Sequence, residues 1–255
     1  MADHNGRVLP PADIFARLRD LHEMAWQAPH DIAAALEGAD DDLDPNLEME
    51  HSVRPLHLAA ISPMPRAPEG VTALLEAGAD PDLDDGLGAP PVFWAARWGE
   101  ASALAELMVK TTDPVQRLDG WSRGIAHWWA IGSDDEGESG EQVLLEAGAD
   151  FLKLDDLGAA PIHWAAGIGG RVERLLAIDP TMAELPDWKG FRPIHYAAGA
   201  GITLAACKPL LAAGVDPGQA AGQFRPTDLL PAEMKADWNA VVGEREDAVP
   251  VGGPT

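Results

Sequence analysis

Cysteine is almost absent from this chain, which has one thiol, Cys207, in 255 residues. A disulfide within the chain is therefore excluded, as is usual in a reducing compartment. The N-terminus also lacks the basic start and apolar run of a secretory signal. No stretch is long and apolar enough to span a bilayer. We therefore expect a cytoplasmic protein.

Positive charge is also scarce, since 18 Lys and Arg residues face 42 Asp and Glu residues for a net charge of -24. Nucleic acid and anionic membranes would be repelled by such a surface, so we expect neither as a partner. Two interpretations remain open. The charge steers a protein with a basic surface toward this one, or it simply keeps a monomer soluble.

Apolar residues, by contrast, are plentiful: they make up 46% of the chain, which suffices for a buried core. Much of this apolar sequence is repeated. The string Leu-Leu-Glu-Ala-Gly-Ala-Asp occurs at residues 74–80 and 144–150. A Pro-apolar-His-x-Ala-Ala string begins at Pro55, Pro161 and Pro193, with degenerate copies at Pro91 and Ile125. Equivalent positions are Pro55, Pro91, Ile125, Pro161, Pro193 and Pro226, at steps of 36, 34, 36, 32 and 33 residues. Such a period indicates stacked supersecondary units.

Each repeat contains signals for two helices. The proline suits the first turn of a helix, where its missing N–H costs nothing. A second helix ends in Leu-Leu-x-Ala, and Gly38, Gly78, Gly148 or Gly214 stops it. Asp, Pro and Gly then predict a turn. No unit can bury its apolar face alone, so we expect neighbouring units to share a continuous core.

These repeats resemble the ankyrin-repeat family, whose signature is Thr-Pro-Leu-His-x-Ala followed by a second helix and a Gly-Ala-Asp turn. The family's preceding Asp-x-x-Gly turn is present at residues 85–88, 155–158 and 187–190. The resemblance covers about residues 31–230. It implies an all-α fold, an ankyrin-repeat solenoid of stacked helix-turn-helix units with short hairpin turns, having about five to six repeats plus capping helices.

Domain boundaries follow from this period. We expect a flexible arm at 1–10, a single ankyrin-repeat domain at 11–242 and a disordered tail at 243–255. Within the domain we expect an N-terminal cap unit at 11–48, repeats at 49–230 and a C-terminal capping helix at 231–242. Apolar residues at helical spacing indicate the two caps: Ile14, Leu18, Leu21 and Ala25 in the first, and Met234, Trp238 and Val241 in the second.

Three irregularities interrupt the pattern. Insertions at 61–68 and 132–141 lengthen the links between the two helices of the first and third full repeats. The second insertion is acidic and glycine-rich, so we expect a mobile loop, which either faces a partner or is a tolerated surface insertion. In the third repeat Trp129 replaces a small alanine. We expect local widening of the stack there, or a side chain directed to solvent.

Four histidines, His57, His127, His163 and His195, recur at one position per repeat. A shared metal ion is one interpretation, but equivalent residues of stacked helices lie about 10 Å apart, whereas zinc ligands lie about 2 Å from one ion. The family resemblance implies instead a hydrogen-bond network between neighbouring repeats. We expect neither a metal nor another cofactor.

The residue after each histidine position is usually aromatic: Trp94, Trp128, Trp164 and Tyr196 follow Leu58 of the first repeat. Trp98 lies where the family varies for recognition. Tryptophan is enriched among interface hot spots. We therefore predict that these five aromatic residues bind a partner. For the four that follow the histidine position, packing between repeats is the other interpretation.

Acidic residues concentrate at the turns between repeats, where Asp82 and Asp84 exceed what the family frame requires. By the resemblance, these turns project beside a concave groove. An acidic edge next to an aromatic groove suits a partner with a basic rim and an apolar centre. We therefore add Asp82 and Asp84 to the predicted partner-binding residues.

Enzyme signatures are missing: there is no phosphate loop, no Gly-x-Ser-x-Gly and no His-Glu-x-x-His. We predict a non-enzymatic interaction scaffold for a protein with a basic surface, with an inhibitor or immunity protein as a narrower variant. The alternative is a small-molecule-binding or catalytic pocket near the third repeat, around His127, Trp128 and Trp129.

Overall fold

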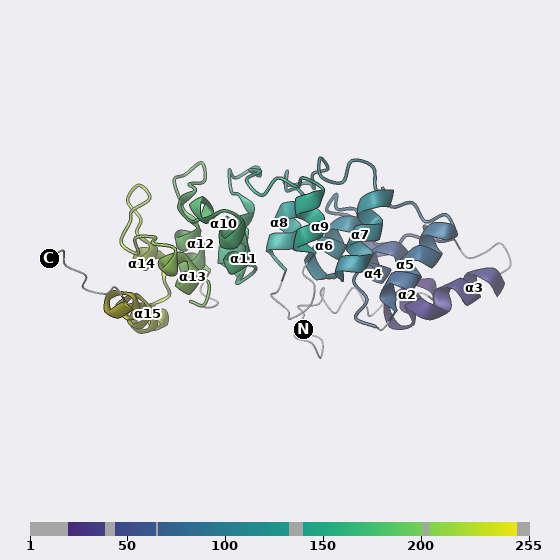
Figure 1. Ribbon diagram of the computed structural model, residues 1–255, viewed down its shortest axis with the longest axis horizontal. Coiled ribbons are helices and arrows are strands. Elements are labelled where there is room, and N and C mark those ends of the chain that lie inside the picture. The colour runs from purple at the N-terminus through teal and green to yellow at the C-terminus, as the bar shows by residue number, and fades with distance from the viewer. Residues whose placement is uncertain (1–19, 39–43, 65, 133–139, 201–203, 249–255) are drawn as a thin grey trace. The chain divides into compact units, whose positions relative to one another are not determined.

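The computed structural model describes residues 20–38, 44–64, 66–132, 140–200 and 204–248 (Figure 1). The predicted arm at 1–10, the cap residues Ile14 and Leu18 and most of the acidic insertion, 133–139, lie outside the described residues. Throughout the described ranges the chain forms helices and turns, with one isolated β-bridge between Ala221 and Phe224. The expected all-α class is confirmed.

Backbone contacts divide the chain into two compact units, residues 1–150 and 151–255. The first unit contains α2 (Asp20–Gln27), η1 (Pro29–Asp31), α3 (Ile32–Gly38), η2 (Glu50–Ser52), α4 (Pro55–Ala59), α5 (Ala67–Glu76), α6 (Pro91–Trp98), α7 (Ala101–Lys110), α8 (Ile125–Ala130) and α9 (Glu141–Glu146). The second contains α10 (Pro161–Ile168), α11 (Val172–Ile178), η3 (Pro180–Glu184), α12 (Pro193–Gly199), α13 (Cys207–Ala212), α14 (Pro226–Leu229), η4 (Ala232–Met234) and α15 (Lys235–Ala248).

The first helix of each repeat begins at the predicted position. Helices α4, α6, α10, α12 and α14 start with a proline that follows an extended residue, and α8 starts at Ile125 after an extended Gly124. Proline fits because the first N–H of a helix has no partner within the helix. Within each unit these first helices pack in succession, α4 on α6 on α8 and α10 on α12 on α14 (Figure 1). We call them the inner helices.

The recurring histidines close the first turn of these helices. The Nδ1 atom of His57, His127 or His163 accepts the backbone N–H three residues earlier, at 3.0–3.2 Å. The other ring nitrogen, Nε2, also forms a hydrogen bond. In His57 its partner is the Ala89 carbonyl, and in His163 its partner is the Leu185 carbonyl. Because Ala89 belongs to the following repeat, the expected hydrogen-bond network between repeats is present.

The second helices, which we call the outer helices, bury leucines, and three of them are stopped by glycine. Gly78, Gly148 and Gly214 follow α5, α9 and α13 with φ of 93°, 74° and 98°. This left-handed conformation favours glycine, and it lets the next amide bond back to a helix carbonyl. The N–H of Ala79, for instance, donates to the Leu74 carbonyl at 2.8 Å.

Trp129 of α8 is fully buried, with 0% of its surface exposed. A side chain directed to solvent, one of the two outcomes expected for the irregular repeat, is therefore wrong. The indole takes the place of a small alanine inside the stack. Local widening of the stack, the other expected outcome, stays a prediction.

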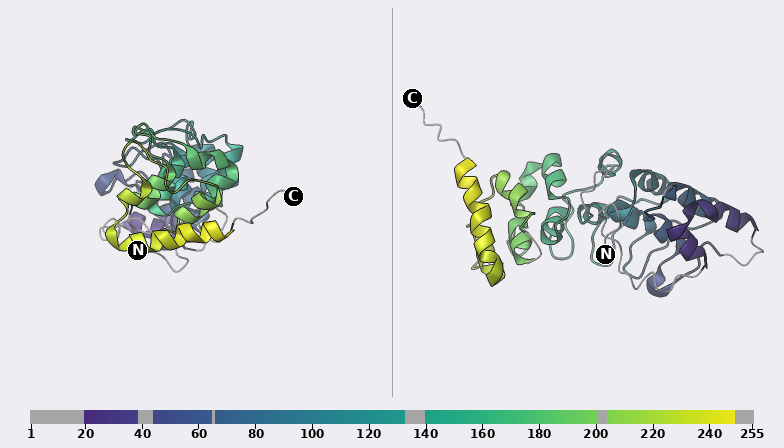
Figure 2. Two further views of the ribbon diagram at one scale, coloured as in Figure 1. Left: turned by 90° about the vertical axis from the view of Figure 1, so that its left-hand side faces the viewer. Right: turned by 90° about the horizontal axis from the view of Figure 1, so that it is seen from below.

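Both ends carry covering helices. Leu21 and Ala25 of α2 are buried, and α2 packs on α4. At the other end, α15 lies beside α13 and buries Trp238 (Figure 2). This helix continues to Ala248, beyond the predicted boundary at 242 and into the segment expected to be a disordered tail. Gly243 does not stop it, since a glycine inside a helix costs only about 1 kcal/mol.

Candidate functional site

Each Asp-x-x-Gly turn, and its counterpart at Asp119, is organised by one aspartate. The Oδ1 atom of Asp85 accepts the N–H groups of Leu87 and Ala89, at 2.8 and 2.9 Å. Asp119, Asp155 and Asp187 repeat this arrangement with the residues two and four positions later. The side chain thereby takes over turn amides that would otherwise lack partners.

The second carboxylate oxygen of each aspartate bonds an aromatic side chain nine residues later. Trp94, Trp128 and Trp164 donate their indole Nε1–H to Oδ2 of Asp85, Asp119 and Asp155, at 2.8, 2.9 and 2.7 Å. The Tyr196 hydroxyl donates to Asp187 Oδ2 at 2.8 Å. We call these four the aspartate–aromatic pairs. Each fastens a turn to the inner helix that follows it.

The sequence itself contains the signal for these pairs. Met49 and Ala220 occupy the aspartate position of the first and last repeats, and Leu58 and Leu229 occupy the matching aromatic position. An aromatic donor is thus present wherever the aspartate is present, and absent wherever it is absent. If the aromatic row served recognition alone, the presence of an aromatic residue would not need to depend on an aspartate nine positions earlier.

The predicted partner-binding aromatics differ in exposure. Trp94 and Trp128 expose only 4% and 2% of their surface, so their rings serve chiefly in the packing between repeats. Trp164 and Tyr196 are partly exposed. Burial and the bond to Asp187 raise the pKa of Tyr196, which therefore stays a neutral donor. These placements support the packing interpretation for Trp94 and Trp128.

Trp98 is partly exposed and has no aspartate of this kind, since the residue nine positions earlier is Ala89. Its ring meets those of Trp94 and Trp128 edge-on, with centroids 5.6 and 6.2 Å apart. The Arg97 guanidinium lies over Trp98, 4.2 Å from the ring centroid. Among the predicted residues of the first unit, Trp98 thus keeps aromatic surface available to a partner.

The predicted acidic residues Asp82 and Asp84 lie close together and share one cation. Arg117 of the following turn bonds Asp82 Oδ1 at 3.1 Å and Asp84 Oδ1 at 2.6 Å. Thr112 donates both its N–H and its hydroxyl to Asp82. Burial raises the pKa of Asp82, but the Thr112 bonds and Arg117 lower it more, so its net pKa is below the ordinary value. These carboxylates join two successive turns, and their available charge is reduced.

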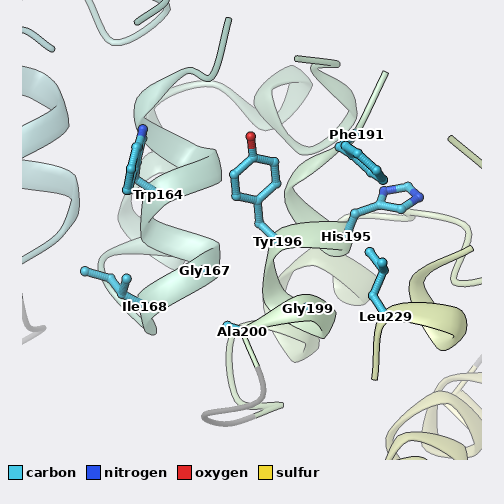
Figure 3. Close-up of a pocket in the computed structure, with 9 residues that line it drawn as sticks. All are labelled: Trp164, Gly167, Ile168, Phe191, His195, Tyr196, Gly199, Ala200 and Leu229. Carbon is cyan, nitrogen blue, oxygen red and sulfur yellow. The ribbon is translucent and has the colours of Figure 1, made fainter. Parts of the chain in front are cut away.

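An open apolar pocket of about 420 Å³ lies within the second unit, between α10, α12 and α14 (Figure 3). Its lining residues are Trp164, Gly167, Ile168, Phe191, His195, Tyr196, Gly199, Ala200 and Leu229. The indole nitrogen of Trp164 and the hydroxyl of Tyr196 point to one side, away from Ile168 and Ala200. The Trp164 and Tyr196 polar atoms donate hydrogen bonds to Asp155 and Asp187. The pocket walls are therefore formed by ring and aliphatic surface.

Small residues open this pocket. Gly167 and Gly199 both take the third place after the aromatic position in α10 and α12, where α6 carries the larger Arg97. A Cβ on Gly167 would be 3.7 Å from the Tyr196 ring. The pocket lies outside the irregular third repeat, where the alternative interpretation of the sequence placed one. There His127, Trp128 and Trp129 expose 2% or less.

The turns also display apolar side chains that sequence reasoning missed. The exposed residues are Leu87 and Trp121 in the first unit, and Leu157, Trp188 and Phe224 in the second, and Trp188 exposes 69% of its surface. A Cβ on Gly158 would be 2.3 Å from the Trp188 ring, so this ring rests on the turn before it. For all of these except Phe224, a bulky apolar residue one or two positions after the turn aspartate was the available signal.

Burial lowers the pKa of three of the recurring histidines. Burial lowers the pKa of His57 to about 3, against a weaker opposing effect of its bond to the Ala89 carbonyl. Burial also lowers the pKa of His163 and of His195. They are therefore neutral at pH 7. Within the described ranges, no group of His, Cys, Asp and Glu is arranged to hold a metal ion.

None of the helices in the described ranges has the length and apolar character needed to cross a membrane.

Comparison with known proteins identifies the fold. No family model matches the sequence, and no curated protein does. The structure is similar to the ankyrin repeat domain of human ASB11, with a TM-score of 0.64 and 20% identity over 93% of this chain and all of that one. It is also similar to the ankyrin repeat domain of Bcl-3, a member of the IkappaB protein family, with a TM-score of 0.55 and 21% identity over 86% of this chain and 97% of that one. With the repeats and turns described above, these likenesses establish that the chain has the ankyrin-repeat fold.

Proposed function

We propose that this protein is a non-enzymatic scaffold that binds another protein through its inner helices and turns. Ankyrin-repeat neighbours support protein interaction in general. The observation that carries the proposal is the open apolar pocket between α10, α12 and α14. An apolar side chain of a partner can enter it and bury ring surface from Trp164 and Tyr196. Desolvated apolar contacts of this kind commonly dominate interface energetics.

The surroundings of the pocket favour a protein partner over a small metabolite. Ile168, at the edge of the pocket, exposes 39% of its surface, and Leu157 and Trp188 on the turns of the same unit expose 53% and 69%. Exposed apolar groups on both inner helices and turns suit a broad contact surface. A catalytic site needs convergent polar groups, but the Trp164 and Tyr196 donors are occupied by aspartates.

The partner that fits this surface best is a basic protein. The net charge of -24 attracts such a partner over long range and repels nucleic acid and anionic membranes. An inhibitor or immunity protein that neutralises a basic toxin is the narrower form of this proposal. A monomeric cytoplasmic protein accords with the solvent-facing acidic charge and the lone buried Cys207.

A small-molecule pocket is the second candidate, because about 420 Å³ lies within the usual range of about 300–1,000 Å³ for ligand sites. Its apolar walls would select an apolar ligand. Binding of a hydrophobic fluorescent probe, competed by the captured partner, would show that both use the same pocket. A probe that binds there while no protein competes would favour this candidate.

A charge placed at the pocket tests the main proposal. Ile168→Asp puts a carboxylate at its rim, and Val109→Asp, at an 81% exposed position of α7, is the matched control. The tagged full chain and both variants are used to capture proteins from cells of the source organism at low and physiological salt. We expect one basic protein to be retained by the wild type and by Val109→Asp, and lost with Ile168→Asp. Equal capture by all three would contradict the proposed surface.

A further inference from the structure

Although the protein is strongly acidic, Arg97 has no carboxylate partner among the residues that the structure describes. It lies in the last turn of α6, is only partly exposed, and its Nε atom is buried without a hydrogen-bond partner in the described part of the chain. No ion pair of the described residues includes it, although the sequence supplies 42 acidic residues for 18 basic ones. A buried donor with no acceptor is rare in native proteins and calls for an explanation.

Aromatic rings hold this guanidinium in place. It lies 4.2 Å from the centroid of Trp98 and 6.0 Å from that of Trp128. Contact with a ring face stabilises the cation but satisfies none of its N–H groups directionally. A guanidinium lying over a ring still has N–H groups along its edge, where a planar carboxylate can accept two of them.

Asp119, which bonds the neighbouring Trp128, is already engaged by other groups. Asp119 accepts the indole N–H of Trp128 and pairs with Arg123 at 2.7 Å, and its other oxygen bonds the turn amides. Burial first, and repulsion from Arg123 second, lower the pKa of Arg97 to about 10. It therefore remains charged at neutral pH, and no carboxylate among the described residues pairs with it.

We propose that Arg97, between Trp98 and Trp128, is the receptor for an Asp or Glu side-chain carboxylate of the partner protein. This inference rests on the proposed function, and it supplies a specific polar contact in the first unit. A partner that is basic overall would place one acidic side chain here and thereby gain orientation as well as affinity.

A side-chain carboxylate fits this site better than two related anions. A phosphate carries more negative charge and would be repelled more strongly by a chain with a net charge of -24. A C-terminal carboxylate is commonly captured by a nest of backbone N–H groups. Arg97 and Trp98 lie at the C-terminal end of α6, where the unpaired backbone groups are carbonyls.

The test observes Arg97 directly in the full chain and needs no protein partner. In ¹⁵N-labelled protein, the Arg97 Nε–Hε resonance is assigned by its loss in Arg97→Lys. N-acetylglutamate N-methylamide supplies a side-chain carboxylate, N-acetylleucine a chain-end carboxylate, N-acetylleucinamide a neutral control, and inorganic phosphate the competing anion. Arg66, whose side chain is 60% exposed and paired with Glu69, is the matched reference resonance.

We expect the glutamate derivative to shift the Arg97 resonance saturably while the Arg66 resonance stays in place and the amide has no effect. Its affinity, followed by tryptophan fluorescence, should fall at least tenfold in Arg97→Met, with circular dichroism confirming the fold. No saturable shift, or tighter binding of phosphate or N-acetylleucine, would overturn the assignment. Because these probes do not involve the pocket of the second unit, their failure leaves the capture experiment with Ile168→Asp unaffected.

Discussion

Replacing Trp94 with phenylalanine removes the indole N–H that donates to Asp85 Oδ2 across 2.8 Å. Both side chains are buried, with 4% and 7% of their surface exposed, so water cannot replace the lost donor easily. Burial raises the pKa of Asp85, while bonds from the Ala89 N–H, the Trp94 indole and the Leu87 N–H oppose that rise. Removing one of the three donors should therefore destabilise the charged carboxylate and, with it, the turn.

The magnitude follows from two separate losses. A hydrogen bond to a buried charged group contributes about 1.5–3 kcal/mol to stability. The smaller ring leaves unfilled volume, which costs about 1 kcal/mol more. We expect Trp94→Phe to lower the free energy of unfolding by about 2.5–4 kcal/mol, a large part of the stability of an ordinary domain.

Urea unfolding followed by circular dichroism measures this change, provided that the slope with denaturant stays constant. Trp238→Phe is the matched control, since Trp238 is 3% exposed and has Leu229 in place of an aspartate nine residues earlier. It should lose only the volume contribution, about 1 kcal/mol. A double-mutant cycle with Asp85→Asn should give a coupling energy of about 1.5–3 kcal/mol. A coupling below about 0.5 kcal/mol would refute a structural role for the pair.

Three further predictions concern stability. The pKa of His57 is about 3 in the folded chain against 6.5 for a free histidine, so the unfolded chain binds the extra proton between these values. Its contribution to stability should therefore fall by about 1.4 kcal/mol per pH unit as the pH drops below 6.5, and an unchanged slope in His57→Gln would contradict this. Ser122 has φ of 60° where the other aspartate turns carry glycine, so Ser122→Gly should raise the free energy of unfolding by about 0.5–1 kcal/mol, and a loss in urea titration would count against it. Gly158→Ala adds a Cβ 2.3 Å from the Trp188 ring at φ of 74°, and should cost about 1–2 kcal/mol and shift the tryptophan emission, and an unchanged emission would contradict the contact.

The arrangement of helices was predictable because its signals are local. The period of the prolines placed the starts of the inner helices, and Gly78, Gly148 and Gly214 placed the stops of three outer helices. Proline and glycine act through their own backbone preferences, which do not depend on residues distant in the sequence. The burial of Trp129 depends instead on how the surrounding elements pack around it, which its residue type alone does not determine.

The candidate site was less predictable, because exposure depends on how residues from different repeats meet. Trp94 and Ile168 both belong to inner helices, yet the first exposes 4% of its surface and the second 39%. The sharing of Arg117 by Asp82 and Asp84 joins residues 33–35 positions apart. The partner-binding roles of the predicted aromatics and acidic residues stay predictions, which the capture experiment and its variants address.

The aspartate–aromatic pairs also determine where this chain can be cut and recombined. Each pair closes within nine residues of one repeat, so both members are inherited together when a whole repeat is duplicated or exchanged. A crossover between Asp155 and Trp164 would instead separate a buried carboxylate from its donor. A chimera that joined Asp155 to the Leu229 helix would bury an acceptor with no aromatic N–H or O–H opposite it. Repeats of this protein are therefore exchangeable modules only when the crossover precedes the turn aspartate.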